Sequence, residues 1–413
     1  MSKKAVVFTL GCKVNSYESA MIEAGLKELG YEVSQKLDYA DLYVLNTCAV
    51  TGEAEKKSRQ LVARARKFNP NAEIIVTGCA SEKNGKVFAQ KTGVKLVTGA
   101  KSKEKILEFI KNKITGIKIE QKDEYPSCEV LPVHEKSRAF VKIQDGCNNF
   151  CSYCIIPYLR GRSRSRNIDE TVTEIENTCA DEIVITGIDI SSYDYCGNKL
   201  DDLIDKISHI DKRIRLGSLE VRVIDEKLLN ALSRLKKFSP QFHLSLQSGS
   251  DKVLKSMNRH YTAEQYYDKV CLIRKYFPLA SVTTDVIVGY ATETEQDFLD
   301  SLNFCKKVEF ADIHCFPYSA REGTMGAKLQ DLPKEVKKQR MDEILLLKQE
   351  LRKKYYEKCK EIPLTFIFEE YDGEYSYGTT DNYIKAKIKG KINSETKIKL
   401  TAFDEICLAE KGE

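Results

Sequence analysis

The sequence predicts an α/β multidomain protein: an N-terminal open α/β sheet domain, a central partial (β/α)6 barrel and a small C-terminal all-β barrel. Three observations support this prediction. The chain of 413 residues is long enough for roughly two or three domains. Strand and helix patterns alternate over most of it, and its C-terminal end shows strand patterns without helices. We place the three domains at residues 1–120, 133–358 and 359–413.

The N-terminal domain contains short apolar runs separated by helical patterns. Buried strands are expected at residues 5–10, 43–46, 74–77 and 94–97. A helix is expected over residues 15–29, with Gly30 as its C-terminal stop, and a second over residues 54–68. This alternation is typical of an open parallel sheet covered by helices.

Residues 112–137 show little periodicity, so we interpret them as a linker. The alternation then resumes up to about residue 319, with helical patterns between the strands and a long charged helix over residues 334–358. Six candidate strands lie at residues 139–143, 182–186, 214–218, 242–246, 283–288 and 312–316. Such a set of parallel strands indicates a partial barrel. The C-terminal module follows, with strands expected at residues 364–368, 383–388 and 397–400.

The composition argues against several classes of protein. Hydrophobic residues make up 42% and charged residues 31% of the chain, which is typical of a folded rather than a disordered protein. No apolar run approaches the ~18–20 residues of a membrane helix, and no secretory signal is evident. Fourteen cysteines without an export signal indicate reduced thiols and a cytoplasmic location. The net charge of +5 does not by itself require a nucleic-acid partner.

Cys147, Cys151 and Cys154 form a CxxxCxxC loop just after the first predicted strand of the barrel. Three thiolates this close in sequence can bind one metal centre. In a four-iron cluster they leave one iron open for an exogenous ligand. The alternative is a zinc site completed by a distant fourth ligand, although none of the five histidines follows at zinc-finger spacing.

Cys12, Cys48 and Cys79 are far apart in sequence, yet each directly follows a predicted strand. The carboxyl ends of parallel strands line one crevice of an open sheet, so we expect these thiols to converge on a second metal centre. The alternative is three ordinary buried thiols, because free cysteine is among the most buried residue types.

These motifs resemble those of the radical S-adenosylmethionine (SAM) methylthiotransferases. Within that family they are most similar to the threonylcarbamoyladenosine tRNA branch, and the resemblance covers essentially the whole chain. The runs that carry it are residues 9–15 (TLGCKVN), 46–51 (NTCAVT), 144–151 (QDGCNNFC) and 160–166 (RGRSRSR).

The resemblance implies two [4Fe-4S] clusters: an auxiliary cluster on Cys12, Cys48 and Cys79, and the radical cluster on the CxxxCxxC loop. One SAM would methylate a sulfur of the auxiliary cluster. A second would give the 5′-deoxyadenosyl radical that removes hydrogen from C2 of adenosine 37 in a tRNA, where the methylthio group is then attached. This adenosine would already carry an N6-threonylcarbamoyl group. The electron donor would be of flavodoxin or ferredoxin type, and a sulfur source is also required.

Three alternatives remain open from the sequence. The same chemistry serves isopentenyladenosine in tRNA or a ribosomal protein in other branches of the family. A metal-bearing RNA-binding protein without catalytic activity is the alternative outside it.

Residues at the predicted strand ends are candidates for binding SAM, because the carboxyl ends of barrel strands face the active side. Some match positions that the family uses for SAM, and others carry groups that can pair with its ribose or its charged ends. Each has the alternative of an ordinary loop or turn role. The candidates are Tyr153, Thr186, Gly187, Glu220, Arg222, Gln247, Ser248 and Val288.

Three groups of basic residues are candidates for binding RNA phosphates; a solvated charge run is the alternative for each. Arg160, Arg162, Arg164 and Arg166 alternate just after the cysteine loop and are expected on one side of an extended segment. The helix over residues 54–68 carries Lys56, Arg59 and Arg66. The C-terminal module, which resembles a TRAM domain, carries a lysine stripe that includes Lys387.

Overall fold

A computed structural model describes residues 3–120, 124–125, 131–132, 137–393 and 395–412. Its N-terminal domain is a six-stranded, all-parallel sheet in the order β2-β1-β3-β4-β5-β6. The strands are β1 (Lys4–Thr9), β2 (Glu32–Ser34), β3 (Leu42–Thr47), β4 (Glu73–Gly78), β5 (Val94–Thr98) and β6 (Gly116–Lys118). The helices are α1 (Lys13–Glu28), α2 (Gly52–Phe68), α3 (Cys79–Ala89) and α4 (Ile106–Lys111).

The four predicted strands and both predicted helices of this domain are confirmed. The strands β2 and β6 were not predicted, because each is three residues long and lacks an apolar run. Since β6 falls within residues 112–137, the prediction of a linker there is wrong at its start. Much of the remaining linker lies outside the described residues.

The central domain has six parallel strand positions, as predicted. One sheet contains β7 (Arg138–Lys142), β10 (Glu182–Thr186), β13 (Arg213–Leu216) and β15 (Lys237–Phe238). The other contains β14 (Ser218–Leu219), β16 (Gln241–Leu244), β17 (Ser281–Val288) and β18 (Asp312–Pro317). The strand predicted at 214–218 is interrupted at Gly217, where the chain passes from one sheet to the other. The two sheets do not close into a ring in the described residues, so the barrel is partial.

The outer helices pack on these strands through a large apolar cluster that includes Ile183, Leu216 and Phe242. The helices are α6 (Ile168–Asn177), α7 (Leu200–Lys206), α8 (Glu226–Arg234), α9 (Asp251–Ser256), α10 (Ala263–Tyr276) and α11 (Glu295–Val308). The long helix α12 (Lys334–Cys359) lies against β17 and β18, which confirms the helix predicted at 334–358. No helix in the described part of the chain has the length and apolar character needed to span a membrane.

The C-terminal module is a closed five-stranded barrel in the order β19-β20-β21-β23-β22. Its strands are β19 (Leu364–Tyr371), β20 (Tyr375–Thr380), β21 (Lys385–Lys389), β22 (Thr396–Ala402) and β23 (Cys407–Lys411). The sequence predicted three of the five. It missed β20, whose segment is polar and contains Gly378, and the short terminal strand β23.

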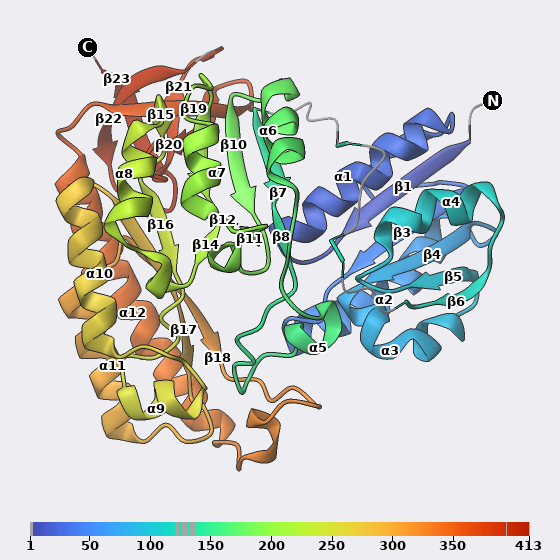
Figure 1. Cartoon of the computed structure of the whole chain (residues 1–413), viewed down its shortest axis with the longest axis horizontal. Helices are drawn as coiled ribbons and strands as arrows, with labels where there is room; N and C mark the ends of the chain where they lie inside the picture. The colour runs from blue at the N-terminus through green and yellow to red at the C-terminus, as the bar shows by residue number, and fades with distance from the viewer. Residues whose placement is uncertain (1–2, 121–123, 126–130, 133–136, 394, 413) are drawn as a thin grey trace.

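The three parts of the chain contact one another. Figure 1 shows the N-terminal sheet beside the open edge of the barrel, with α1 next to β7 and α3 near α5 (Ile156–Arg160). The C-terminal module covers the end at which the barrel strands begin. There, Arg138 at the start of β7 donates hydrogen bonds of 2.8 Å to Glu369 and Thr379.

Candidate active site

The first cysteine set lies in the loop between β8 (Gln144–Asp145) and α5. Cys151 is buried, whereas Cys147 and Cys154 are partly buried. The thiols interact electrostatically with one another, so they lie close together. Burial raises the pKa of Cys147 and that of Cys154 to about 12. Because the thiolate is the form that binds a metal, binding of a metal centre to these thiols would release their protons.

Arg259, between α9 and α10, contacts this loop and was missed in the sequence. Its Nη1 donates to Cys151 Sγ at 3.5 Å, and its Nη2 donates to the carbonyl oxygen of Ser245 at 3.0 Å. Nη2 also lies 4.0 Å from Glu220 Oε1. The guanidinium thus links the cysteine loop to two strand ends of the barrel. No spacing or motif around position 259 singled it out.

The candidate SAM residues come from neighbouring strand ends on the side of the cysteine loop. Thr186 ends β10, Glu220 follows β14, Gln247 follows β16 and Val288 ends β17. Glu220 accepts hydrogen bonds from the backbone and the Nε of Arg222, which is otherwise exposed. These groups remain candidates on this geometry, as does Gly187 directly after Thr186.

Tyr153, the last candidate for SAM binding, belongs to the cysteine loop. It packs against an apolar cluster that contains Met257 and Tyr290. Burial raises its pKa well above the ordinary value for tyrosine, so the phenol is neutral. A partly buried neutral ring beside the cysteines is suited to contact a nucleobase.

The structure contradicts the prediction that Ser248 binds SAM. Its side chain is fully buried, its hydroxyl lies 3.1 Å from Ser301 Oγ of α11, and it accepts from the backbone N–H of Ser250. The hydroxyl therefore stabilises the turn against α11 and does not face the strand ends where SAM was predicted to bind.

The second cysteine set follows three adjacent strands whose ends are in register. Cys12 follows β1, Cys48 follows β3 and Cys79 begins α3 after β4. Electrostatic interactions connect all three thiols, as the sequence predicted for parallel strand ends. Burial raises the pKa of Cys48 to about 11.

Two glycines make this arrangement possible. Gly11 has φ +114°, and a Cβ on it would lie 3.0 Å from Cys48 Sγ. Gly78 has φ +104°, and a Cβ on it would lie 2.3 Å from the carbonyl oxygen of Thr47. Side chains at both positions would strain the backbone. At Gly11 the side chain would fill the space beside the Cys48 sulfur, and at Gly78 it would collide with the backbone of Thr47.

The donor sets fit iron–sulfur clusters better than single ions. A zinc ion needs its sulfurs all about 2.3 Å from one point. No three His, Cys, Asp or Glu side chains among residues that the structure describes meet in that way. A four-iron cluster binds each thiolate through a different iron and therefore accepts wider spacing.

The two cysteine sets lie against the same apolar cluster of the domain interface. Cys79 belongs to this cluster together with Ile155 and Leu159 of the segment after the first set. Cys154 packs against it. Cysteines of the two sets, on different domains, are thereby brought to one region of the molecule.

The prediction that Arg160 binds RNA is wrong. Its side chain is fully buried and donates to Glu18, Asp145 and Asn15 at 2.7–3.1 Å. Glu18 also pairs with Lys142 and Lys103. These side chains join α1 of the N-terminal domain to the barrel. We call them the interface charge cluster; its members are Asn15, Glu18, Lys103, Lys142, Asp145 and Arg160.

The prediction that Arg164 and Arg166 bind RNA is wrong for the same reason, because both side chains are buried and pair inside the protein. Arg164 is buried and lies 3.5 Å from Asp145. Arg166 is buried and pairs with Glu174. The alternating pattern 160–166 marked residues that pair inside the protein, and burial cannot be distinguished from exposure by charge spacing alone.

Arg162 is the exposed member of the series. Its guanidinium stacks on the ring of Phe150, 4.5 Å from the centroid, and stands at the rim of the cysteine loop.

We expect Arg162→Ala to weaken tRNA binding and to lower the slope of log affinity against log salt by ~1, because one phosphate contact is lost. Binding titrations at several salt concentrations measure this. Arg234→Ala, which removes an exposed arginine of α8 outside the candidate sites, is the control, and an unchanged slope for R162A would contradict the assignment.

The other basic candidates are accessible to different degrees. Lys56 is exposed, while Arg59 is tied to Glu55 at 3.0 Å and Arg66 is half-buried. Lys387 lies over the ring of Tyr375, 5.3 Å from its centroid. All four remain candidate phosphate contacts.

Comparison with known proteins decides the family. Residues 4–99 match the uncharacterized protein family UPF0004, and residues 141–305 match the radical SAM superfamily. The chain is 38% identical over 403 residues to a protein of Bacillus subtilis named threonylcarbamoyladenosine tRNA methylthiotransferase MtaB, covering 92% of this chain and 89% of the relative. The chain belongs to the radical SAM tRNA methylthiotransferases.

Other methylthiotransferases are similarly close. An Aquifex aeolicus protein with the MtaB name is 35% identical, with 94% and 97% of the two chains covered. A Clostridium novyi protein named tRNA-2-methylthio-N(6)-dimethylallyladenosine synthase is 38% identical, with 83% and 80% covered. Among solved structures, the radical SAM methyltransferase TsrM from Kitasatospora setae shares the fold with a TM-score of 0.59 at 14% identity, covering 79% and 78%.

Membership of this methylthiotransferase family confirms the resemblance seen in the sequence. The chain is an enzyme that uses SAM and two [4Fe-4S] clusters. The alternative of a non-catalytic metal-bearing protein is therefore rejected.

Proposed function

We propose that this enzyme transfers a methylthio group to C2 of N6-threonylcarbamoyladenosine at position 37 of tRNA. The observation that carries the proposal is the meeting of two three-cysteine sets at one domain interface, with Cys79 inside the apolar cluster that Cys154 touches. The relatives from Bacillus subtilis and Aquifex aeolicus, which align over nearly the whole chain, are named for this substrate.

The residues have separate roles in this proposal. Cys147, Cys151 and Cys154 hold the radical cluster, and Cys12, Cys48 and Cys79 hold the auxiliary one. When bound, the clusters and SAM supply the radical and the methylated sulfur, which no side chain can provide at an aromatic C–H bond. Arg259 positions Cys151 and the Ser245 strand end, while Glu220 and Arg222 present opposite charges for the charged ends of SAM.

The proposal extends to the whole chain. Residues 1–120 carry the auxiliary site, residues 133–358 the SAM site, and residues 359–413 help to hold tRNA. An electron donor of flavodoxin or ferredoxin type and a separate sulfur source complete the reaction. A cytoplasmic location suits thiols that must stay reduced; no cysteine in the described residues is in a disulfide.

A second candidate substrate is dimethylallyladenosine at the same position of tRNA. The Clostridium novyi relative is named for the methylthiolated form of that nucleoside. Its sequence identity to this chain, 38%, equals that of the Bacillus subtilis relative, but it extends over 369 rather than 403 residues. The two substrates differ in the N6 group: one carries a carboxylate, whereas the other is an uncharged hydrocarbon.

Mass spectrometry of tRNA nucleosides after anaerobic incubation with reconstituted enzyme, SAM and reductant tests the proposal. We expect 2-methylthio-N6-threonylcarbamoyladenosine to accumulate and the dimethylallyl substrate to remain unchanged. Product from only the dimethylallyl substrate would replace the proposal by the second candidate, and no methylthiolated nucleoside from either would reject both.

A further inference from the structure

The segment between β18 and α12, residues 318–333, contacts both cysteine loops. The backbone N–H of Gly326 donates to the carbonyl oxygen of Ser152, inside the CxxxCxxC loop, at 2.6 Å. Nη2 of Arg321 donates to the carbonyl oxygen of Ala49, in the loop after β3, at 2.7 Å. We call residues 318–333 the bridging segment, because it joins a loop of the barrel to a loop of the N-terminal domain.

The guanidinium of Arg321 is held firmly in this position. The side chain is buried, and Nη2 also donates to Glu55 Oε2 of α2 at 2.6 Å. Glu55 is in turn 3.0 Å from Arg59 and 3.5 Å from Lys83. The hydroxyl of Thr324 donates to the carbonyl oxygen of Arg321 at 2.7 Å, which fixes the backbone of the turn. Since a buried charge is costly without its partners, this contact between the two domains is expected to persist.

The peptide unit between Ala49 and Val50 connects Arg321 to the sulfur of Cys48. Its carbonyl oxygen accepts from Arg321, and its N–H, on Val50, donates to Cys48 Sγ at 3.5 Å. Because a peptide unit is planar, a contact that fixes the direction of the carbonyl also fixes the direction of the N–H. A charged donor on the carbonyl further polarises the N–H. The guanidinium therefore acts, through one peptide unit, on a hydrogen bond to one of the three sulfurs of the second cysteine set.

We propose that Arg321 is a positioning residue for the auxiliary cluster, which it serves by orienting the N–H that donates to the Cys48 sulfur and by fixing this cysteine relative to the radical loop. The inference rests on the proposed roles of the two cysteine sets. Hydrogen bonds to the sulfurs set the reduction potential of an iron–sulfur cluster. Because reduction adds negative charge, such a hydrogen bond and a nearby cation both favour the reduced form.

A redox titration monitored by electron paramagnetic resonance tests this on the anaerobically reconstituted full chain. The titration uses a Cys151→Ala background, in which the auxiliary cluster alone is expected to give the signal. We expect Arg321→Met to shift the midpoint potential of this cluster to more negative values. Arg321→Lys should restore most of the potential, because lysine keeps the charge and a donor for the Ala49 carbonyl.

Product analysis of the chain with both clusters gives the second measurement. At saturating tRNA, R321M should lower the ratio of methylthiolated nucleoside to 5′-deoxyadenosine about tenfold, because a misplacement of ~1 Å can reduce a rate by ~100-fold. SAM cleavage itself should continue, since Arg321 contacts the second cysteine loop and not the first.

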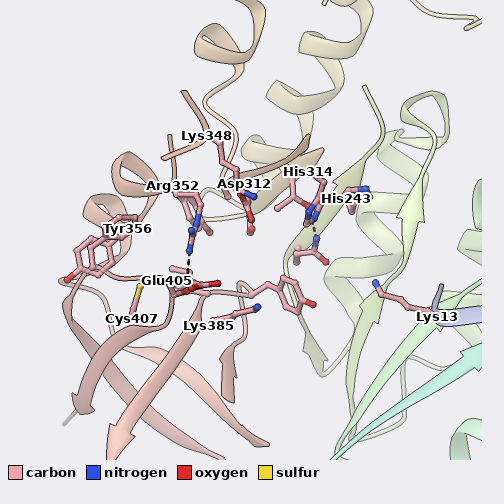
Figure 2. Close-up of a pocket in the computed structure, with 18 residues that line it drawn as sticks. Lys13, His243, Asp312, His314, Lys348, Arg352, Tyr356, Lys385, Glu405 and Cys407 are labelled. Atoms are coloured by element: carbon pink, nitrogen blue, oxygen red, sulfur yellow. Dashed lines mark hydrogen bonds and ion pairs between the residues drawn. The ribbon is translucent and has the colours of Figure 1, made fainter. Parts of the chain in front are cut away.

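Two other arginines provide matched controls. Arg340 is buried and pairs with Glu293 at 2.6 Å, within the central domain. Arg352 joins α12 to the C-terminal module by donating to the carbonyl oxygen of Glu405 at 3.2 Å, beside a cavity at the end where the barrel strands begin (Figure 2). R340M and R352M should keep both the potential and the ratio, because these contacts lie outside the cysteine loops.

An unchanged potential in an R321M variant that retains its auxiliary cluster would overturn the proposal, as would a shift of the same size in either control. Equal losses of 5′-deoxyadenosine and methylthiolated nucleoside would also overturn it, because a general loss of folding lowers both. If R321M loses its iron, Arg321→Gln takes its place, since glutamine keeps a donor but no charge; an unchanged potential in R321Q would overturn the proposal as well. Failure of the proposed function would appear separately, as absence of methylthiolated product from the wild type.

Discussion

Replacing Cys151 with alanine reduces 5′-deoxyadenosine formation from SAM to the rate without enzyme. Cys151 is the most buried thiol of its loop and the one that Arg259 contacts, and a three-thiolate site that loses one ligand no longer holds its cluster. Replacing Cys48 leaves some SAM cleavage but abolishes methylthiolated tRNA. Liquid chromatography of the SAM products and mass spectrometry of the tRNA measure the two activities.

Iron and sulfide analysis makes this comparison sharper. The wild type should hold about eight of each per chain, and each variant about half, because two four-iron clusters are present. Cys271→Ala is the control, since Cys271 is exposed on α10 and outside both sets. Retained SAM cleavage in C151A, or unchanged methylthiolated product in C48A, would refute the corresponding assignment.

Replacing Glu18 with glutamine destabilises the contact between the N-terminal domain and the barrel by about 3–5 kcal/mol. Glu18 is buried in the interface charge cluster, where Arg160 and Lys142 donate to it at 2.8–3.1 Å. The variant leaves these two cations buried with one anion fewer. Thermal unfolding of the full chain, followed with and without reconstituted clusters, measures the loss.

The same carboxylate makes stability depend on pH. Burial alone would raise its pKa, but Arg160 and Lys103 hold the pKa of Glu18 well below the usual range. A lowered folded-state pKa stabilises the protein above the unfolded value of ~4.3, and that contribution is lost as pH falls toward the folded value. We therefore expect wild type and E18Q to differ most near neutral pH and to converge in acid.

Glu53→Gln is the matched control. Glu53 pairs with Lys57 one turn along α2 at 2.7 Å, but both side chains are exposed. An unchanged melting temperature is expected for E53Q. A drop as large as that of E18Q would show that loss of any acidic residue, and not the buried cluster, is responsible.

The strands of the two α/β domains were predictable because parallel buried strands are continuous apolar runs. Residues 74–77 and 182–186 are examples, and β4 and β10 form there. The edge strands β2 and β6 were missed because they have little apolar surface to reveal them. In the C-terminal module, β20 was missed because its segment is polar and contains Gly378, although it pairs with the strands directly before and after it.

The sequence by itself was sufficient to identify the family, the two cysteine sets and the position of the second set directly after strands. Ligand spacing and the ends of apolar runs are local properties that a sequence displays directly. Only the tertiary structure decided what the arginines after the cysteine loop do. The same positive charge binds a phosphate when it faces water and an internal carboxylate when it is buried, and a partner such as Glu18 lies 142 residues away from Arg160 in sequence. A cavity lined by Lys13, Gln241 and Lys385 likewise forms only where three parts of the chain that are distant in sequence pack together.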